Sequence, residues 1–277
     1  MLASIIENSK KIVIKIGSNT LANADGSINK EFLNALSDQV AGLIGNGKQI
    51  VLVSSGARIA GVATIGKWMR KADMHYKQAL CAIGQVELMD AYRKVFAAHQ
   101  IHVGQMLLTR DDFLDGSRTL NIRNTLFTLL DEGVVPIINE NDTVSVEEIK
   151  IGDNDTLAAL TTNLWNADLL ILFSDIDGLY NRNPNEHHDA TLIEEVEDID
   201  QLLTTVEVGD TSDFGTGGIA TKLEAAKKVN SYGIPMILAN GKKERILDRL
   251  LSGTERATVF LPGHSTTGKE QIKTSPK

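Results

Sequence analysis

The chain has 277 residues, of which 42% are hydrophobic and 23% are charged. No apolar run approaches the ~20 residues that a transmembrane helix needs. Its 28 basic and 36 acidic residues give a formal charge of −8, without the dense basic clusters typical of nucleic-acid binding. We therefore expect a soluble protein with no membrane and no nucleic-acid partner.

The N-terminal segment and the cysteine content indicate the compartment. The sequence MLASIIENSKK lacks the charged region and apolar stretch of a secretory signal. Cys81 is the only cysteine, so no intramolecular disulfide can form, which fits a reducing environment. These features predict a cytoplasmic protein.

Apolar runs alternate with helical patterns along the chain. Strands are predicted at residues 11–16, 49–53, 102–108, 134–138, 168–173 and 235–239. Helices are predicted at residues 29–46, 56–66, 73–99, 117–132, 154–166 and 218–232. This alternation predicts an α/β fold, with a mostly parallel sheet between helices on both faces.

The chain shows no internal repeat and no linker that would divide it. Residues 181–217 are polar with weak periodicity, which indicates an excursion from the main sheet. Residues 262–277 resemble a loose tail. We expect one domain over residues 1–261.

The first two predicted strands each end at residues suited to binding an anion. Lys15 lies near the end of the first apolar run, and Gly17 follows it; together they offer a charge and accessible backbone amides to a phosphate. Ser55 and Gly56 follow the second strand and precede a helix. The alternatives are a solvent-facing lysine on an edge strand and a serine that only caps the helix.

The segment VPIINENDTVSVEEIKIGDND carries the densest polar clusters. Asn139 to Asp142 follow a predicted strand, and Gly152 to Asp155 precede a predicted helix. Ligands of open α/β sheets bind at such positions, and these side chains can hold a small polar molecule, Mg²⁺ or an ammonium group. Alternatively, both clusters are only turn and cap residues.

Two later motifs also place polar residues at the end of a predicted strand or the start of a predicted helix. GTGGIATK, residues 215–222, would place a glycine turn before a helix, with Lys222 one turn inside it; a flexible loop is the alternative. SDIDGLY follows an apolar strand, and its Asp175 and Asp177 suggest an aspartate-based phosphatase, although Leu179 occupies the position where that motif needs threonine. His187, His188 and Asp189 could suggest a metal, but such runs are usually solvated.

Taken together, the motifs resemble the amino acid kinase family over about residues 10–260. The pieces that carry the resemblance are VIKIGSNTL, IVLVSSGARIAG, AIGQ, IHVGQMLLTR, NIRNT, VPIINENDTVSVEEIKIGDND, SDIDGLY and GTGGIATK. NEND together with GDND is similar to the corresponding motifs of those members that phosphorylate the γ-carboxylate of L-glutamate for proline synthesis. The resemblance implies a three-layer α/β/α sandwich.

The resemblance also implies a role for each matching residue. Lys15, Lys222 and Asp155 would be catalytic, and Ser55, Asp142 and Asn154 would bind glutamate. Gly17 and Gly56 would offer backbone amides to the phosphoryl oxygens. The residues expected to contact ATP are Lys15, Ser174, Asp175, Thr216, Gly217, Gly218, Ile219, Ala220, Thr221 and Lys222.

Cofactors and partners follow from the same resemblance. It implies ATP, with Mg²⁺ held mainly by the phosphates and not by the protein. It implies a homo-oligomer, a dimer or a tetramer, and contact with the next enzyme of proline synthesis. Many relatives carry a C-terminal PUA domain, for which this chain is too short, and many carry an aliphatic residue in place of Arg58, whose role the sequence does not reveal.

Three alternatives remain from the sequence. One is a kinase of the same fold acting on N-acetylglutamate, although an acceptor for a free ammonium group exists in Asp142 and Asn154. Another is a phosphatase built on Asp175 and Asp177. The third is a nucleotide-binding sensor without turnover, which the presence of Lys15, Lys222 and Asp155 disfavours.

Overall fold

The computed structural model describes residues 1–66, 70, 73–145, 154–184, 186–205 and 218–263. Its main sheet comprises β1 (Lys11–Ile16), β2 (Gln49–Ser54), β3 (Val103–Leu108), β4 (Val135–Glu140), β5 (Leu169–Ser174), β8 (Glu195–Val196), β9 (Met236–Asn240) and β10 (Thr258–Phe260). The strand order is β3-β4-β2-β1-β5-β9-β10-β8. A separate antiparallel pair joins β6 (Leu179–Tyr180) to β7 (Leu192–Ile193).

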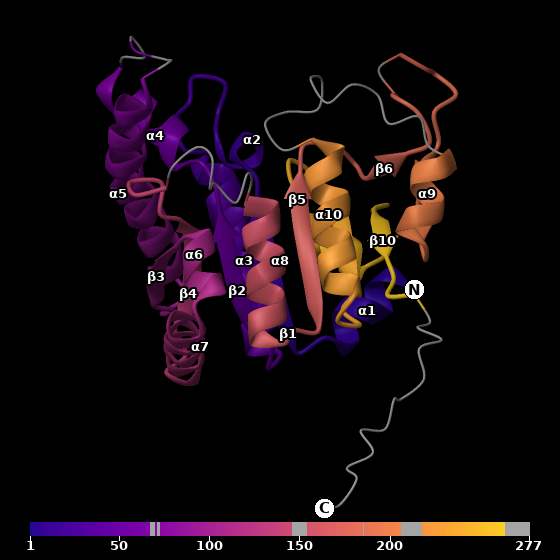
Figure 1. The fold of residues 1–277 in the computed structure, drawn as a ribbon, viewed down its shortest axis with the longest axis horizontal. Coiled ribbons are helices and arrows are strands. Elements are labelled where there is room, and N and C mark those ends of the chain that lie inside the picture. The colour runs from indigo at the N-terminus through magenta and orange to yellow at the C-terminus, as the bar shows by residue number, and fades with distance from the viewer. Residues whose placement is uncertain (67–69, 71–72, 146–153, 185, 206–217, 264–277) are drawn as a thin grey trace, which may run out of the picture.

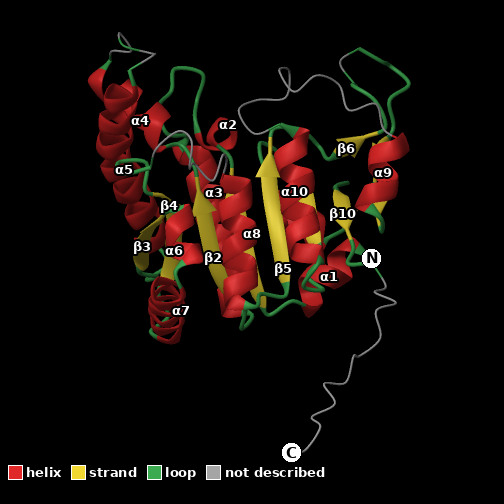
Figure 2. Ribbon diagram, viewed as in Figure 1, coloured by secondary structure: helices red, strands yellow, loops and turns green. Residues whose placement is uncertain are grey.

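Helices cover both faces of this sheet (Figures 1 and 2). They are α1 (Leu2–Asn8), α2 (Ser18–Leu21), α3 (Lys30–Gly45), α4 (Ala57–Ile65), α5 (Met74–Ala97), α6 (Arg110–Leu114), α7 (Gly116–Asp131), α8 (Asn154–Trp165), α9 (Ile199–Thr205), α10 (Ile219–Asn230) and α11 (Ile246–Leu251). The prediction from the alternation, helices on both faces of a sheet, is therefore confirmed, as is the three-layer α/β/α sandwich that the resemblance implied.

Strand β1 occupies a central position in the sheet. It pairs in parallel with β2 on one side and with β5 on the other. The strands β4 and β9 extend the parallel arrangement outward on either flank. Within the main sheet, as far as its residues are described, only β10 runs antiparallel to a neighbour, β9. The mostly parallel sheet is confirmed.

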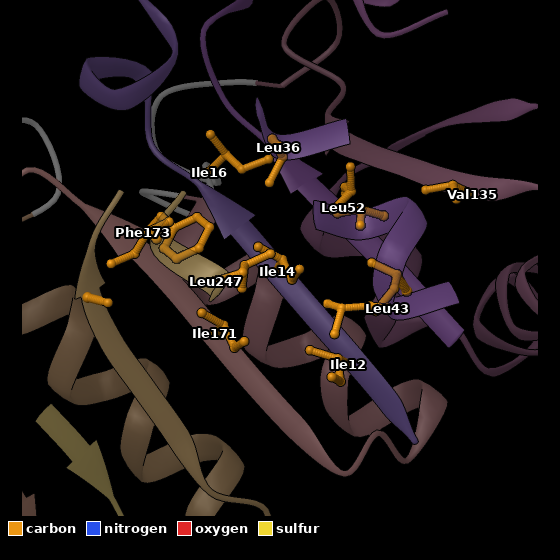
Figure 3. Close-up of a cluster of buried hydrophobic side chains, with 14 of the residues drawn as sticks. Ile12, Ile14, Ile16, Leu36, Leu43, Leu52, Val135, Ile171, Phe173 and Leu247 are labelled. Carbon is orange, nitrogen blue, oxygen red and sulfur yellow. The ribbon is translucent and has the colours of Figure 1, made fainter. Parts of the chain in front are cut away.

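The two-residue period of β1 divides its side chains between two cores. Ile12, Ile14 and Ile16 pack against α3, α5 and α11 on one face, where they meet residues such as Leu36 and Leu247 (Figure 3). Val13 faces the other core, which α7, α8 and α10 cover. Lys15 has the same parity as Val13, so the fold directs a charged side chain toward α8 and α10.

Several predicted boundaries need correction. The predicted loop at NEND is wrong for its first two residues, because β4 continues through Asn139 and Glu140 and both are buried. The predicted excursion of residues 181–217 is wrong in part, because β8 returns to the main sheet beside β10. The short elements α1, α2, α6, α9, α11 and β10 were not predicted, since each has too few residues to show a clear period.

Two predictions concern the ends and the membrane. The boundary predicted at residue 261 stays a prediction; β10 ends at Phe260, and residues 264–277 lie outside the described part of the chain. In the part that is described, no helix combines the length and the apolar character needed to cross a bilayer.

Glycines bring α4 and α5 into close contact. A Cβ atom on Gly84 would lie 1.7 Å from the carbonyl oxygen of Ala57, and one on Gly61 would lie 1.9 Å from that of Leu80. These distances are far below van der Waals contact, so only glycine permits this crossing. The position of α4, which follows directly from β2, depends on it.

We expect Gly84→Ala to lower the free energy of unfolding by at least about 2 kcal/mol, because the added methyl group must push α4 away from α5. Gly42→Ala is the matched control, since nothing lies within 4 Å of a Cβ atom at that helical position. The control should raise stability by about 0.5–1 kcal/mol through helix propensity. Urea unfolding measures both, and a Gly84→Ala variant as stable as the parent would contradict the crossing.

Candidate active site

Polar residues gather at one edge of the sheet, where the parallel strands end. The carboxyl ends of β1, β2, β4 and β5 share this edge because the strands are parallel in series. The helices α4, α8 and α10 begin beside it (Figure 1). Open α/β sheets bind their ligands at such an edge, so this arrangement defines the candidate site.

A buried carboxylate links two buried lysines at the centre of this edge. The Nζ atom of Lys15 lies 2.5 Å from Oδ1 of Asp155, and Nζ of Lys222 lies 3.4 Å from its Oδ2. The Thr221 hydroxyl donates to the same Oδ2 at 3.1 Å. Asp155 is fully buried, and the two lysines are 3% and 4% exposed. The prediction of an edge strand with a solvent-facing lysine is therefore wrong.

The Asp155 carboxyl group titrates below its ordinary range. Burial alone would raise its pKa, but the charges of Lys15 and Lys222 and the hydrogen bonds from Lys15 and Thr221 outweigh this effect and lower it. The group is therefore ionised at neutral pH. The cluster contains two cations and one anion, so it retains one net positive charge for a further anion.

Two glycines leave the backbone open beside this charge. A Cβ atom on Gly17 would lie 3.3 Å from the carbonyl oxygen of Phe173 and 3.7 Å from Nζ of Lys15. Gly56 has a φ of 99° and is the N-cap of α4 without any side-chain cap, so Ser55 does not act as the cap. The first amide groups of α4 therefore remain available to an anion.

The amide of Asn154 has a single orientation that its neighbours determine. Its Nδ2 donates to the Ser54 carbonyl at 3.1 Å, to Ser55 Oγ at 2.8 Å and to Asn139 Oδ1 at 2.9 Å. A carbonyl can only accept, which assigns the nitrogen to this side of the amide. The Oδ1 atom of Asn154 is thus left as an acceptor, and the Ser55 hydroxyl keeps its proton to donate elsewhere.

Asn139 and Gln85 extend this network, although neither was predicted to be a site residue. Asn139 Nδ2 donates to Gln85 Oε1 at 2.9 Å, and its Oδ1 accepts from the amide of Glu140 at 2.8 Å. Both residues are at least nine-tenths buried. Each lay in a motif, NEND or AIGQ, that could have drawn attention to it; only the fold shows that the two side chains meet.

A cavity of about 220 Å³ opens beside this network. Its lining residues are Ser18, Ser55, Gly56, Ala57, Arg58, Ile59, Met74, Lys77, Gln78, Cys81, Asn139, Glu140, Asp142 and Asn154. The structure thus brings Ser55, Asp142 and Asn154 together, as predicted. Gly152 and Asp153 of the predicted GDND cluster lie outside the described residues.

The other flank of the edge carries the residues predicted to contact a nucleotide. Ser174 ends β5, and its hydroxyl donates to Asp175 Oδ1 at 3.3 Å. Asn19 donates to Asp175 Oδ2 at 3.0 Å, which connects this flank to the segment after Gly17. Residues 218–222 form the start of α10. The predicted contacts Thr216 and Gly217 lie outside the described part of the chain.

Asp177 belongs to a structural ion pair rather than to a nucleophile site. It accepts from Asn240 at 2.8 Å and lies 3.0 Å from Nζ of Lys243. Burial opposes ionisation of Asp177, but these two contacts lower its pKa overall. Because Asn240 and Lys243 already engage Asp177, the geometry disfavours Asp177 as the partner of Asp175 in phosphatase chemistry.

Comparison with known proteins agrees with this geometry. Residues 10–240 match the model of the amino acid kinase family. The chain is 73% identical over 263 residues to the glutamate 5-kinase of Alkaliphilus metalliredigens, which covers 95% of this chain and 100% of that protein. It is 43% identical over 294 residues to the glutamate 5-kinase of Treponema pallidum strain Nichols, covering 95% and 99%.

Solved structures match at the level of the fold. The UMP kinase of Bacillus anthracis superposes with a TM-score of 0.63 at 15% identity, over 92% of this chain and 96% of that one. An isopentenyl phosphate kinase superposes with a TM-score of 0.62 at 17% identity, over 90% and 99%. At these identities the likeness supports the architecture alone.

The lowered pKa of Asp155 predicts how stability depends on pH. Ionised Asp155 stabilises the fold above its unfolded-state pKa of about 3.9, and this contribution is lost as the pH falls through the lower folded-state value. Asp155→Asn leaves two buried lysines without a counterion, which should cost on the order of 3–5 kcal/mol at neutral pH. The difference from the parent should shrink below about pH 4.

Urea unfolding of the parent and of Asp155→Asn, from pH 7 down to the lowest pH at which both fold, measures this difference. Glu87→Gln, at an exposed position in the middle of α5, is the control and should show a small, constant effect. A stability difference for Asp155→Asn that stays constant across the range would show that Asp155 does not hold the lysines by its charge.

Proposed function

The chain belongs to the amino acid kinase family, and from that premise we propose that it transfers the γ-phosphoryl group of ATP to the γ-carboxylate of L-glutamate. The product is L-glutamyl 5-phosphate, and the reaction is the first step of proline biosynthesis. The observation that carries this proposal is the 73% identity to a glutamate 5-kinase along that protein's full length. The buried Lys15–Asp155–Lys222 cluster supports it chemically.

Phosphoryl transfer depends mainly on position and charge. A γ-carboxylate oxygen attacks the γ-phosphorus, the bond from that phosphorus to the β-bridging oxygen breaks, and ADP leaves with the negative charge. The carboxylate is already ionised, so the reaction needs no general base. Lys15 and Lys222 stabilise negative charge on the oxygens of the γ-phosphoryl group during its transfer, and Asp155 holds the two ammonium groups in place.

The backbone at Gly17 and Gly56 contributes to the same end of the site. Neither residue has a side chain to cover its amide, and each follows the carboxyl end of a central strand. Amide groups at these positions donate to phosphoryl oxygens without reorganising during the reaction. The two lysines and the two glycines therefore form a preformed cradle for the transferred group.

Ser55, Asp142 and Asn154 bind the amino-acid substrate in the cavity beside this cradle. Asn154 presents Oδ1 and Asp142 presents a carboxylate, both of which accept hydrogen bonds from an α-ammonium group. N-acetylglutamate, the substrate of the rival kinase, carries no such group. The cavity thus favours a free amino acid over its acetylated form.

ATP lies on the opposite flank, against Ser174, Asp175 and the start of α10. Residues 216–222 contact its phosphates, with Lys15 and Lys222 reaching the γ-phosphate. Mg²⁺ accompanies the nucleotide and supplies positive charge to the phosphates when bound. Its ligands would come mainly from ATP, because Asp155 is already paired with Lys15 and Lys222.

The remaining predictions are part of the same proposal. The enzyme works in the cytoplasm as a homo-oligomer, a dimer or a tetramer, and passes its product to the next enzyme of proline synthesis. Residues 1–261 form the kinase domain, since β10 ends at Phe260.

A trapping assay tests the reaction directly. The enzyme, ATP and Mg²⁺ are combined with hydroxylamine, and hydroxamate and ADP are measured with L-glutamate, N-acetyl-L-glutamate, L-aspartate, carbamate or UMP in separate reactions. We expect hydroxamate with L-glutamate alone, because hydroxylamine captures the acyl phosphate. If ADP forms only with a different substrate, L-glutamate is not the phosphoryl acceptor. If none of the five substrates is turned over, the proposed kinase activity is refuted.

Substitution of one lysine tests the proposed phosphoryl site. Lys222→Met should lower kcat with L-glutamate by at least about 10²-fold through lost charge stabilisation. Lys227→Met, at an exposed position of the same helix, should change kcat little. Circular dichroism establishes that both variants fold, and near-parental kcat in a folded Lys222→Met variant would remove Lys222 from the mechanism.

A further inference from the structure

We propose that Arg58 binds the α-carboxylate of the amino-acid substrate and so selects an α-amino acid over an amine that carries only the reacting carboxylate. This inference rests on the proposed function and specifies it further. It gives a role to a residue that neither the strand-end motifs nor the phosphoryl chemistry uses.

The position of Arg58 places it at the substrate. It is the second residue of α4, directly after the turn formed by Ser55 and Gly56. It lines the cavity of about 220 Å³ together with Asp142 and Asn154. Arg58 is half-buried, and from this position in α4 its side chain can reach a ligand in the cavity.

Within the described part of the chain, the guanidinium group of Arg58 has no other use. No hydrogen bond, ion pair or ring contact of Arg58 occurs in the structure as far as it is described, although Glu140 and Asp142 line the same cavity. Glu140 already accepts from the Ser145 hydroxyl at 2.6 Å. Lys77, the other cation of the lining, does have an interaction partner. A guanidinium group that no ion pair of the described fold engages is available to an anionic ligand.

Of the three charged groups of L-glutamate, one still needs a cation as its partner. Its γ-carboxylate must approach Lys15 and Lys222 to react, and its ammonium group suits Asp142 and Asn154 Oδ1. Only the α-carboxylate then lacks a cation. A planar guanidinium presents two parallel N–H groups that match a carboxylate in a bidentate pair.

Ser55 completes the recognition of the α-carboxylate. Its Oγ accepts from Asn154 at 2.8 Å, so its own proton is free to be donated. Ser55 and Arg58 lie on the same short segment at the start of α4, where the unsatisfied amides also favour an anion. The α-carboxylate would thus meet a hydroxyl, a guanidinium group and the positive end of a helix.

The test compares two substrates in the parent and in Arg58→Met, which keeps a long apolar stem and a good helix former while removing the charge. L-glutamate carries the α-carboxylate, and 4-aminobutyrate has the same chain, amine and reacting carboxylate without it. ADP release gives kcat and KM for each substrate. Where 4-aminobutyrate reacts too slowly, its inhibition constant against L-glutamate replaces kcat/KM.

We expect Arg58→Met to raise the KM for L-glutamate by about 10- to 100-fold, the range for a lost charged hydrogen bond. The KM for ATP and the kcat/KM or inhibition constant of 4-aminobutyrate should stay within about twofold of the parent. Arg58→Lys should recover part of the loss, because an ammonium group restores the charge without the bidentate geometry. Arg93→Met, at an exposed position of α5, is the control and should leave all constants unchanged.

The outcomes separate this inference from the proposed function. If the parent phosphorylates L-glutamate and Arg58→Met keeps its KM, Arg58 does not bind the α-carboxylate, while the kinase function stands. An equal loss for L-glutamate and 4-aminobutyrate would likewise overturn the inference, since it would show a general distortion of α4. If the parent does not phosphorylate L-glutamate at all, both the function and the inference fail.

Discussion

The site depends on one electrostatic arrangement, the burial of a carboxylate between two lysines. Moving three charged groups out of water is expensive, and the mutual attraction of Asp155 with Lys15 and Lys222 offsets that cost only when the geometry is close. The three residues come from β1, α8 and α10, so the layers on this face must pack correctly before the charges can meet. The fold and the charge of the site are therefore coupled, because the three side chains can meet only when α8 and α10 pack correctly against β1.

The period of the strands places that charge and separates it from the substrate cavity. Lys15 shares a face with Val13, toward α8 and α10, whereas Ser54 shares the opposite face with Leu52 and contacts Tyr92 of α5 at 2.9 Å. A shift of one residue in the register of β1 would send Lys15 into the apolar core on the other face. The parallel pairing of Lys15 with Val53 and Leu172 fixes that register from both sides. The direction of the Lys15 side chain therefore follows from ordinary sheet pairing.

Much of this fold could be predicted from the sequence, because its long strands and helices have clear periods. The ends of β4 and the return of β8 could not, since a polar residue such as Asn139 reads as a loop until its buried amide partners are known. The candidate site was predictable as separate strand-end motifs, and the resemblance to a family indicated which residues belong together. The pairing of Asn139 with Gln85 was not predictable from the residues, because 54 positions separate them and only the packing of α5 on the sheet joins them. Arg58 was visible in the sequence, but only the fold shows that it has no partner among the described residues.

The central place of β1 has a consequence for how such an enzyme can change. The cavity lined from β2, α4, α5 and β4 lies on one flank of β1, and the residues from β5 and α10 lie on the other. Lys15 stands on the boundary and is shared by both flanks. Under the proposed function, substitutions on the flank of the cavity would alter which molecule receives the phosphoryl group while the nucleotide flank stays intact. The sheet order would thus let the two substrates be changed separately, with β1 between them.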